Sequence, residues 1–570
     1  MHDLAIRGGM VVDGTGAPAR TEDVAVSDGI VVEVGRGVGP ARREVQADGM
    51  LVTPGWVDIH THYDGQATWD PDMTPSSWHG VTTAVFGNCG VGFAPVRPGA
   101  EKYLINLMEG VEDIPEIVLA EGIDFRWESF DDYMAALGET PRVMDIGAQV
   151  PHGALRFYVM GERGADHEQA PSEDEIARMG ALLEEALSAG ALGFTTSRTI
   201  KHRARDGRPT PGLSAGNPEL NGLARGMRRA GAGVLEVNSD FGDGDFERLR
   251  AMAEIAGRPL SLLLVQINHD PDQWRRILDG VARANREGVT ARAQVGCKPI
   301  GIMLGLETSL QPFALHPLWS ELKDMAPAAR VARLLADGDL RRRLVETPPE
   351  ALQVPLRADL MERTYELADP MDYEPTPDRT LAARARAEGT SPWRLALDAM
   401  LTRGGKGLLM HTFENYTAGS LDVVRQMLVD ENTVCGVADA GAHVGLICDA
   451  GAPTFLLSHW ARDRRRGDKL PLEFLVKKHT RDTAAHYGLL DRGVIAPGYR
   501  ADLNLIDFAA LRLRLPEVAY DLPAGGKRLV QRADGYRHTF VAGIETLRDG
   551  ALTGARPGRF LRGAQAAPRR

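Results

Sequence analysis

Two histidines separated by one residue stand near the start of the chain, at His60 and His62. Apolar or β-branched residues alternate with polar ones over residues 57–62, which is the period of a β-strand. Both imidazoles therefore leave the same face of one predicted strand, close to its end. Histidines at this spacing can bind one divalent metal ion. The turn pairs Pro54-Gly55 and Asp64-Gly65 that bound the stretch favour a metal site over two hydrogen-bonded structural histidines.

Other polar side chains follow predicted buried strands farther along the chain. Cys89 lies in a glycine-bounded turn, His269 follows a strongly apolar run, and Asp439 lies among alanines and glycines. If the strands are parallel and close into a barrel, their carboxyl ends meet at one face. These side chains would then join the histidine pair in a set suited to zinc, with a carboxylate base.

Each of these residues also has a structural alternative. Cys89 could pack as a small hydrophobic residue, and His269 could cap its strand. A buried carboxylate at Asp439 would be costly unless a metal or a metal-bound water compensates its charge. Three more histidines near strand ends could either polarise a substrate carbonyl or be structural: His152, His411 and His443.

The composition limits the classes of function. The chain has 570 residues, of which 43% are hydrophobic and 25% charged, and its net charge of −12 argues against a nucleic-acid partner. No apolar run is long enough to span a membrane. Four cysteines do not make a disulfide framework, and no signal-peptide pattern opens the chain, so we expect a cytoplasmic protein. The arginine triplets at 341–343 and 464–466 are interpreted as solvated helix faces.

The pattern of elements predicts the fold. Over residues 55–489, short apolar runs alternate with longer amphipathic segments such as 173–189 and 217–230. This alternation predicts an α/β fold in which a parallel sheet closes into a (β/α)8, TIM-like barrel. Nine strands are readable, among them residues 81–86 and 408–412, so one of the nine must be misassigned or lie outside the barrel. Residues 299–405 are too many for a simple connection, and we expect an insertion over the mouth of the barrel.

The two ends of the chain have a different character from its middle. Residues 1–54 and 490–570 contain short strand patterns separated by glycine-containing turns. We expect both ends to form one small β-sandwich, into which the barrel of residues 55–489 is inserted.

These motifs resemble those of a known family. The N-terminal strands, residues 52–64 (VTPGWVDIHTHYD) and residues 497–503 (PGYRADL) are similar to the amidohydrolase superfamily of metal-dependent hydrolases. Within it, residues 82–90 (TTAVFGNCG), 265–269 (VQINH) and 414–416 (ENY) resemble the D-aminoacylase branch, the N-acyl-D-amino-acid deacylases. The resemblance runs over nearly the whole chain. It implies a (β/α)8 barrel beside a β-sandwich, with one or two zinc ions in the barrel mouth.

The resemblance also implies roles for individual residues. His60 and His62 correspond to the metal ligands of the first strand, and Cys89 corresponds to the cysteine ligand of the branch. His269 corresponds to the histidine ligand of the sixth strand, and Asp439 to the catalytic aspartate.

The chain departs from the branch at the end of the fifth strand. The branch usually has another metal-binding histidine there, whereas this chain has Asn238 at the nearest position. Either the second metal position is lost, or Glu236 or Asp240 takes the place of the histidine.

We therefore expect hydrolysis of an amide bond by metal-activated water, with Asp439 as the base and a small-molecule N-acyl-D-amino acid or similar amide as substrate. Arg198 and Lys298, which follow predicted strands, could bind a substrate carboxylate or form ordinary ion pairs. The same chemistry would serve a cyclic amide, urea, carbamate or lactone. An alternative of another class is a catalytically silent scaffold relative. A homo-oligomer is compatible with such a chain.

Overall fold

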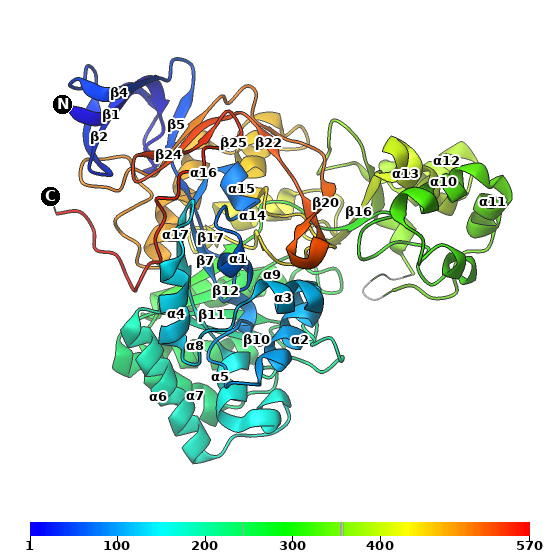
Figure 1. Ribbon diagram of the computed structural model, residues 1–570, viewed down its shortest axis with the longest axis horizontal. Coiled ribbons are helices and arrows are strands. Elements are labelled where there is room, and N and C mark those ends of the chain that lie inside the picture. Colours follow the sequence, from blue (N-terminus) through cyan, green and yellow to red (C-terminus); the bar gives the residue numbers. More distant parts are fainter. Residues whose placement is uncertain (243, 354–355, 357, 570) are drawn as a thin grey trace.

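A barrel of parallel strands forms the centre of the molecule (Figure 1). The computed structural model describes residues 1–242, 244–353, 356 and 358–569. Its barrel strands hydrogen-bond in the orders β6–β7–β8 and β9–β10–β11–β12–β13–β17. Strands β8 and β9 are separated by one residue and together form a single stave of the barrel. The described strands therefore make the eight staves that the sequence predicts. The strands are β6 (Trp56–Asp58), β7 (Val81–Phe86), β8 (Asp145–Ala148), β9 (Val150–Pro151), β10 (Gly193–Arg198), β11 (Val234–Ser239), β12 (Leu260–Leu264), β13 (Ala291–Val295) and β17 (Thr433–Cys435).

The barrel closes between its first and last strands, just beyond β6 and β17. The backbone N–H of Asp439 donates to the carbonyl of His60 (3.1 Å), and that of His62 donates to the carbonyl of Ala440 (2.8 Å). This closure brings the histidine pair and Asp439 to the same end of the barrel, where parallel strands present their carboxyl ends.

Helices surround the barrel on its outer side. The predicted helices over residues 173–189 and 217–230 are α6 and α7 of the structure. Helix α6 begins at a capping box between Ser172 and Glu175 and ends at Gly190, whose φ of 118° suits a left-handed cap. The long helices around the barrel are α2 (Glu101–Glu112), α4 (Phe130–Glu139), α5 (His152–Met160), α6 (Glu173–Ala189), α7 (Asn217–Ala230), α8 (Asp245–Ala256), α9 (Gln273–Arg286), α14 (Asp422–Val429) and α16 (Leu472–His479). None of the described helices combines the length and apolarity needed to cross a membrane.

The one predicted strand too many, over residues 408–412, lies outside the barrel. It is β16 (Leu408–Glu414), which pairs antiparallel with β14 (Ile300–Leu304) and β15 (Thr364–Leu367). These three strands form the root of the inserted segment. Their sheet is buried, which explains why β16 has the apolar sequence of a barrel strand.

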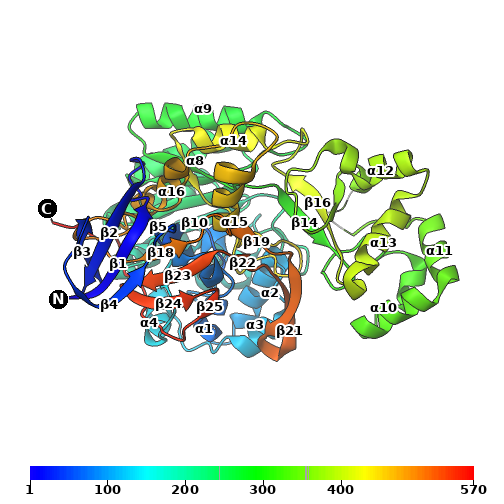
Figure 2. The same cartoon turned by 90° about the horizontal axis from the view of Figure 1, so that it is seen from above.

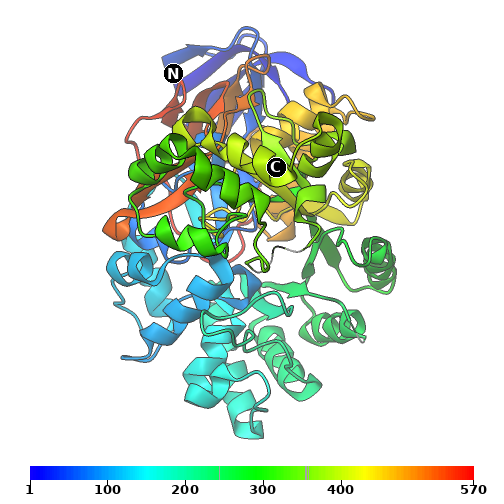
Figure 3. The ribbon, with the colours of Figure 1, turned by 90° about the vertical axis from the view of Figure 1, so that its right-hand side faces the viewer.

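The inserted segment forms a lobe that projects to one side of the barrel (Figures 1 and 2) and faces the viewer in Figure 3. Its helices are α10 (Pro327–Ala336), α11 (Gly338–Glu346), α12 (Leu381–Glu388) and α13 (Pro392–Gly405). Side chains from these helices and from β14 and β16 pack into a hydrophobic cluster of their own, which includes Phe313, Leu334 and Leu397. The segment therefore has a separate core.

Strands from both ends of the chain share one sheet. Its hydrogen-bonded order is β25–β24–β23–β18–β5–β1–β2–β3, with β4 paired to β1. Strand β1 pairs β4 along its first half and β5 near its end, and the enclosed core joins Leu4 and Val24 to Leu503 and Phe540. The strands are β1 (His2–Val11), β2 (Arg20–Ser27), β3 (Ile30–Gly35), β4 (Ala41–Gln46), β5 (Leu51–Pro54), β18 (Leu503–Ile506), β23 (Tyr536–Val541), β24 (Ile544–Arg548) and β25 (Ala551–Leu552).

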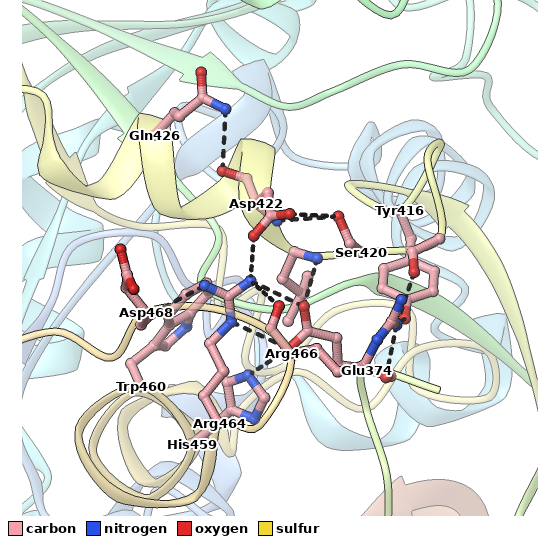
Figure 4. A network of polar contacts seen from close by, with 12 residues as sticks. Glu374, Tyr416, Ser420, Asp422, Gln426, His459, Trp460, Arg464, Arg466 and Asp468 are labelled. Atoms are coloured by element: carbon pink, nitrogen blue, oxygen red, sulfur yellow. Dashed lines mark hydrogen bonds and ion pairs between the residues drawn. The ribbon is translucent and has the colours of Figure 1, made fainter. Parts of the chain in front are cut away.

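A buried polar network ties the end of the inserted segment to the barrel (Figure 4). The guanidinium of Arg464 donates to both carboxylate oxygens of Glu374 (3.2 and 3.0 Å) and to Asp422 (2.6 Å) at the start of α14. Arg466 donates to the backbone carbonyls of Glu374, Pro375 and Gly419. The interpretation of residues 464–466 as a solvated helix face is therefore wrong, because Arg464 is only 2% exposed.

The Glu374 carboxylate should stabilise the fold in a pH-dependent way. Burial alone would raise its pKa, but hydrogen bonds from His459 and Arg464 lower the pKa of Glu374 to about 2. The stabilisation is then complete above the ordinary Glu value of 4.5 and is lost as the pH falls through about 2. We expect Glu374→Gln to lower the free energy of unfolding at pH 7 by about 3 kcal/mol, because Arg464 loses a buried partner.

Urea unfolding of the wild type and the variant between pH 7 and pH 3 checks this expectation. The difference between them should shrink toward the acid end. Glu388→Gln, which removes the partly exposed partner of Arg384, is the matched control and should change stability little. Equal effects of the two substitutions would contradict the assigned role of Glu374.

Candidate metal centre

Three metal-binding side chains meet at the mouth of the barrel. His60, His62 and Cys89 each offer a ligand atom, and these atoms all lie within 4.8 Å of one another. The Sγ atom of Cys89 lies 3.5 Å from Nε2 of His60. All three residues are buried, with at most 3% of their surface exposed. The sequence predicted each of them, and the structure brings them together.

Asp439 completes this group from the opposite side of the barrel seam. Its Oδ1 atom lies 3.3 Å from Nε2 of His60 and 3.8 Å from Nε2 of His62. Asp439 has a φ of 46°, in the left-handed region that non-glycine residues seldom adopt. Such backbone strain gathers at functional sites, where the surrounding structure enforces it.

A tight turn after β7 places the cysteine. Gly87 has a φ of 83°, and a Cβ atom there would lie 2.3 Å from the carbonyl of Gln149, so only glycine fits. The hydroxyl of Thr195 on β10 bridges this turn, donating to the Gly87 carbonyl and accepting from the Gly90 N–H. The N–H of Cys89 donates to Glu236 on β11 (3.0 Å). Two neighbouring strands therefore fix the position of the thiol.

Each histidine of the pair presents Nε2 to the centre and uses Nδ1 for orientation. Nδ1 of His60 lies 2.9 Å from Oε1 of Gln294, whose amide nitrogen in turn donates to Ser261 (2.9 Å). Because Oε1 can only accept, the proton of His60 is on Nδ1 and Nε2 keeps its lone pair. Nδ1 of His62 faces Oε1 of Glu112 at 3.2 Å. Acceptors behind metal-binding histidines commonly hold the ring in this way.

Glu112 is a buried carboxylate that the sequence analysis missed. It is 1% exposed, and both its oxygens lack a well-aligned hydrogen bond. Besides His62, it faces Nε2 of His443 at 3.6 Å, and its backbone carbonyl accepts from the N–H of His443. The helical period of the sequence indicates its burial, since Glu112 lies four residues after Met108 on the buried face of α2. His443 therefore contacts the group through Glu112.

Four acidic groups are crowded at this site. Burial, followed by repulsion from Glu236, Glu112 and Asp439, raises the pKa of the Cys89 thiol well above its ordinary value. Burial and neighbouring carboxylates likewise raise the pKa of Glu112 far from its usual range and that of Glu236 to about 8. Burial also raises the pKa of Asp439 well above its normal value. Without a cation these groups must hold protons, and a divalent metal would compensate their charge.

The histidines of the site are uncharged at neutral pH, because burial lowers their pKa values. Burial lowers the pKa of His60 and His443 to about 4 and that of His62 well below its ordinary value. At neutral pH they are neutral, which is the form that binds metal. Two imidazole nitrogens, one thiolate and a nearby carboxylate are a donor set suited to zinc.

The structure does not bring His269 to this group, contrary to the prediction. Strand β12 ends at Leu264, and the following residues turn toward the end of β16. The backbone of Gln266 exchanges hydrogen bonds with Asn415, and the Asn268 amide donates to the carbonyl of Phe413 (2.6 Å). These bonds carry His269 to the surface, where it is exposed.

The two predicted substrate cations are committed to internal ion pairs. Nε of Arg198 lies 2.9 and 3.0 Å from the two oxygens of Asp245, and the residue is 8% exposed. Nζ of Lys298 lies 2.8 Å from Asp449 and donates to the Cys448 carbonyl. The ordinary ion-pair alternative therefore holds for both residues, because burial requires each charge to be paired.

The remaining candidates have other partners as well. His152 lies between the Thr196 hydroxyl (2.8 Å) and Glu219 (3.0 Å). Nδ1 of His411 lies 3.1 Å from the Thr364 hydroxyl on β15. Of the two residues considered as substitutes for the fifth-strand histidine, Glu236 accepts from Cys89, while Asp240 accepts from Thr199 (2.7 Å).

The chain is similar to known hydrolases along nearly its whole length. Residues 43–547 match the pattern of the amidohydrolase family. The chain is 28% identical to an N-acyl-D-aspartate deacylase of Alcaligenes xylosoxydans xylosoxydans, over 99% of this chain and 96% of that protein. It is 27% identical to a D-aminoacylase of the same organism, over 98% and 97% of the two chains.

A solved D-aminoacylase, described for its binuclear metal center, has the same fold with a TM-score of 0.65 and 25% identity. The match covers 99% of this chain and 100% of the other. These matches confirm the fold and the resemblance predicted from the sequence, including the D-aminoacylase branch and the hydrolase class. The chain belongs to the amidohydrolase family.

Proposed function

We propose that the chain is a zinc-dependent hydrolase that cleaves the amide bond of a small N-acyl-D-amino acid or a similar N-acyl amide. The observation that supports this function best is the meeting of His60, His62 and Cys89 around the carboxylate of Asp439 at the barrel mouth. The substrate class is proposed from the relatives, which are named as deacylases of N-acyl-D-aspartate and as a D-aminoacylase.

His60, His62 and Cys89 would hold the ion, with Asp439 beside it. A bound zinc would supply a Lewis acid and lower the pKa of a water molecule to about 7. Asp439 borders the space that the ligand atoms face, so its carboxylate would take a proton from the attacking water and return it to the leaving nitrogen. Gln294 and Glu112 would keep the two imidazoles aligned.

Replacing the base should separate catalysis from metal binding. Asp439→Asn keeps the size of the side chain but cannot accept a proton, so we expect turnover to fall by about 10²-fold or more while the zinc content is retained. Steady-state kinetics and metal analysis of the same preparation check this. Undiminished turnover would contradict the role of Asp439.

Metal binding should release protons. The thiol of Cys89 and the carboxyl of Asp439 have raised pKa values, so zinc must displace protons that they hold near neutral pH. Affinity for zinc should therefore weaken as the pH falls. Calorimetric titration of chelator-treated protein with zinc, in buffers of different ionisation enthalpy, counts the protons. His60→Ala should lose most of the binding heat, and binding without proton release would contradict the crowded acidic site.

A substrate panel tests the proposed reaction. N-acyl-D-amino acids should be hydrolysed faster than their L-enantiomers, cyclic amides, ureas, carbamates or lactones. Preference for a cyclic or ester substrate would keep the metal site but change the substrate class. Absence of both bound metal and hydrolysis would favour the scaffold alternative.

A further inference from the structure

The end of β11 holds a side chain that hydrogen-bonds to the proposed metal ligand Cys89. The amide nitrogen of Asn238 lies 3.7 Å from the Sγ atom of Cys89 and donates to it. The same nitrogen lies 3.4 Å from Nε2 of His202. Asn238 is the residue nearest the place where a fifth-strand histidine was expected. An amide N–H group donates hydrogen bonds and binds no metal.

His202 lies in the loop after β10, and no sequence pattern indicated that it would approach the site. Its Nδ1 atom lies 3.0 Å from the hydroxyl of Ser197, a residue that is 1% exposed. Because the amide nitrogen of Asn238 can only donate, Nε2 of His202 accepts and Nδ1 carries the proton. The ring is therefore neutral and joins Ser197 to Asn238. Both N–H groups of the Asn238 amide are used, one by Cys89 and one by His202.

The loop that carries His202 is fixed on both sides. Asp240, just beyond β11, accepts from the Thr199 hydroxyl (2.7 Å) and from the Ile200 N–H (2.8 Å). Lys201 pairs with Glu414 at the end of β16. His202 is thus held in place beside β11 by contacts that are independent of any metal.

We propose that this chain binds a single metal ion at His60, His62 and Cys89, and that Asn238 closes the second metal position through its hydrogen bond to Cys89, with His202 holding the Asn238 amide in place. This inference rests on the proposed metal-dependent function. Two observations support it. His269 is exposed and does not face the site. Among the residues that the structure describes, His60, His62 and Cys89 form the one cluster of three or more side chains that could bind a metal ion. Asn238 and His202 would act as positioning residues, because donation to sulfur holds the thiolate toward one ion.

Metal counting on designed variants tests the inference. Wild-type protein loaded with zinc and dialysed should retain one equivalent. Asn238→His places an imidazole beside Cys89 and His202 and should raise the content to two equivalents. Asn238→Ala removes the same amide without adding a ligand and should stay at one. His202→Ala should also keep one equivalent, since the inference makes His202 a hydrogen-bond partner and not a ligand.

A spectroscopic readout adds a test that does not depend on counting metal ions. Cobalt-substituted wild-type protein should show the electron paramagnetic resonance signal of an isolated ion. Its absorption spectrum should contain a thiolate-to-cobalt charge-transfer band. This band should shift in Asn238→Ala, because the variant lacks the hydrogen-bond donor to sulfur. Two equivalents or coupled ions in the wild type would overturn the inference, as would metal loss in His202→Ala. Failure of Asn238→His to gain metal would also overturn it. Absence of metal from the wild type would instead refute the proposed function.

Discussion

The repulsion among four acidic groups, three of them buried and the fourth, Asp439, largely buried, is the constraint on which the rest of this site depends. Cys89, Glu112, Glu236 and Asp439 lie around two neutral histidines in a region from which water is largely excluded. Apolar packing around such groups cannot stabilise their charged forms. Their close approach is compatible with folding only if they hold protons or share a cation. A metal site is thus the condition under which this arrangement becomes reactive at neutral pH.

The barrel imposes this arrangement through its backbone. Hydrogen bonds across the seam hold the segment after β6 against the segment after β17, which sets His60 beside Asp439. The turn after β7 then adds the thiol, anchored by residues of β10 and β11. Since these contacts are made by main-chain atoms or by residues behind the site, the ligands are positioned before any metal binds. Such preorganisation is what a catalytic site requires.

Periodicity and turn chemistry predicted much of the fold. The bounds of α6, α7 and β7 follow directly from amphipathic or buried patterns and from capping residues. Strand β16 was wrongly counted among the barrel strands, because a strand buried in a small antiparallel sheet has the same apolar sequence as a buried barrel strand. The site was predicted where a residue follows a strand end, as at His60, Cys89 and Asp439. Glu112 lies at a helix end, where the helical period indicates burial but not a place at the site. His202 lies in a loop, and its approach to the site depends on tertiary packing that no local pattern encodes.

The ligand set expected from the resemblance is changed at two strands, by Asn238 at the end of β11 and by His269, which is exposed beyond β12. Residues 266–268 bond to the end of β16, which turns His269 away, and Lys201 of the His202 loop pairs with Glu414 of the same strand. The root of the inserted segment therefore affects both places where further metal ligands were expected. This coupling explains physically how one region of the chain can determine the composition of the metal centre.

X-ray absorption at the zinc edge of the loaded protein tests the central claim most directly. The account predicts one sulfur neighbour at about 2.3 Å, from Cys89, together with nitrogen and oxygen neighbours near 2.0–2.1 Å. The sulfur contribution should disappear in Cys89→Ser. A zinc environment without sulfur in the wild-type protein would contradict the claim that His60, His62 and Cys89 together form the metal centre.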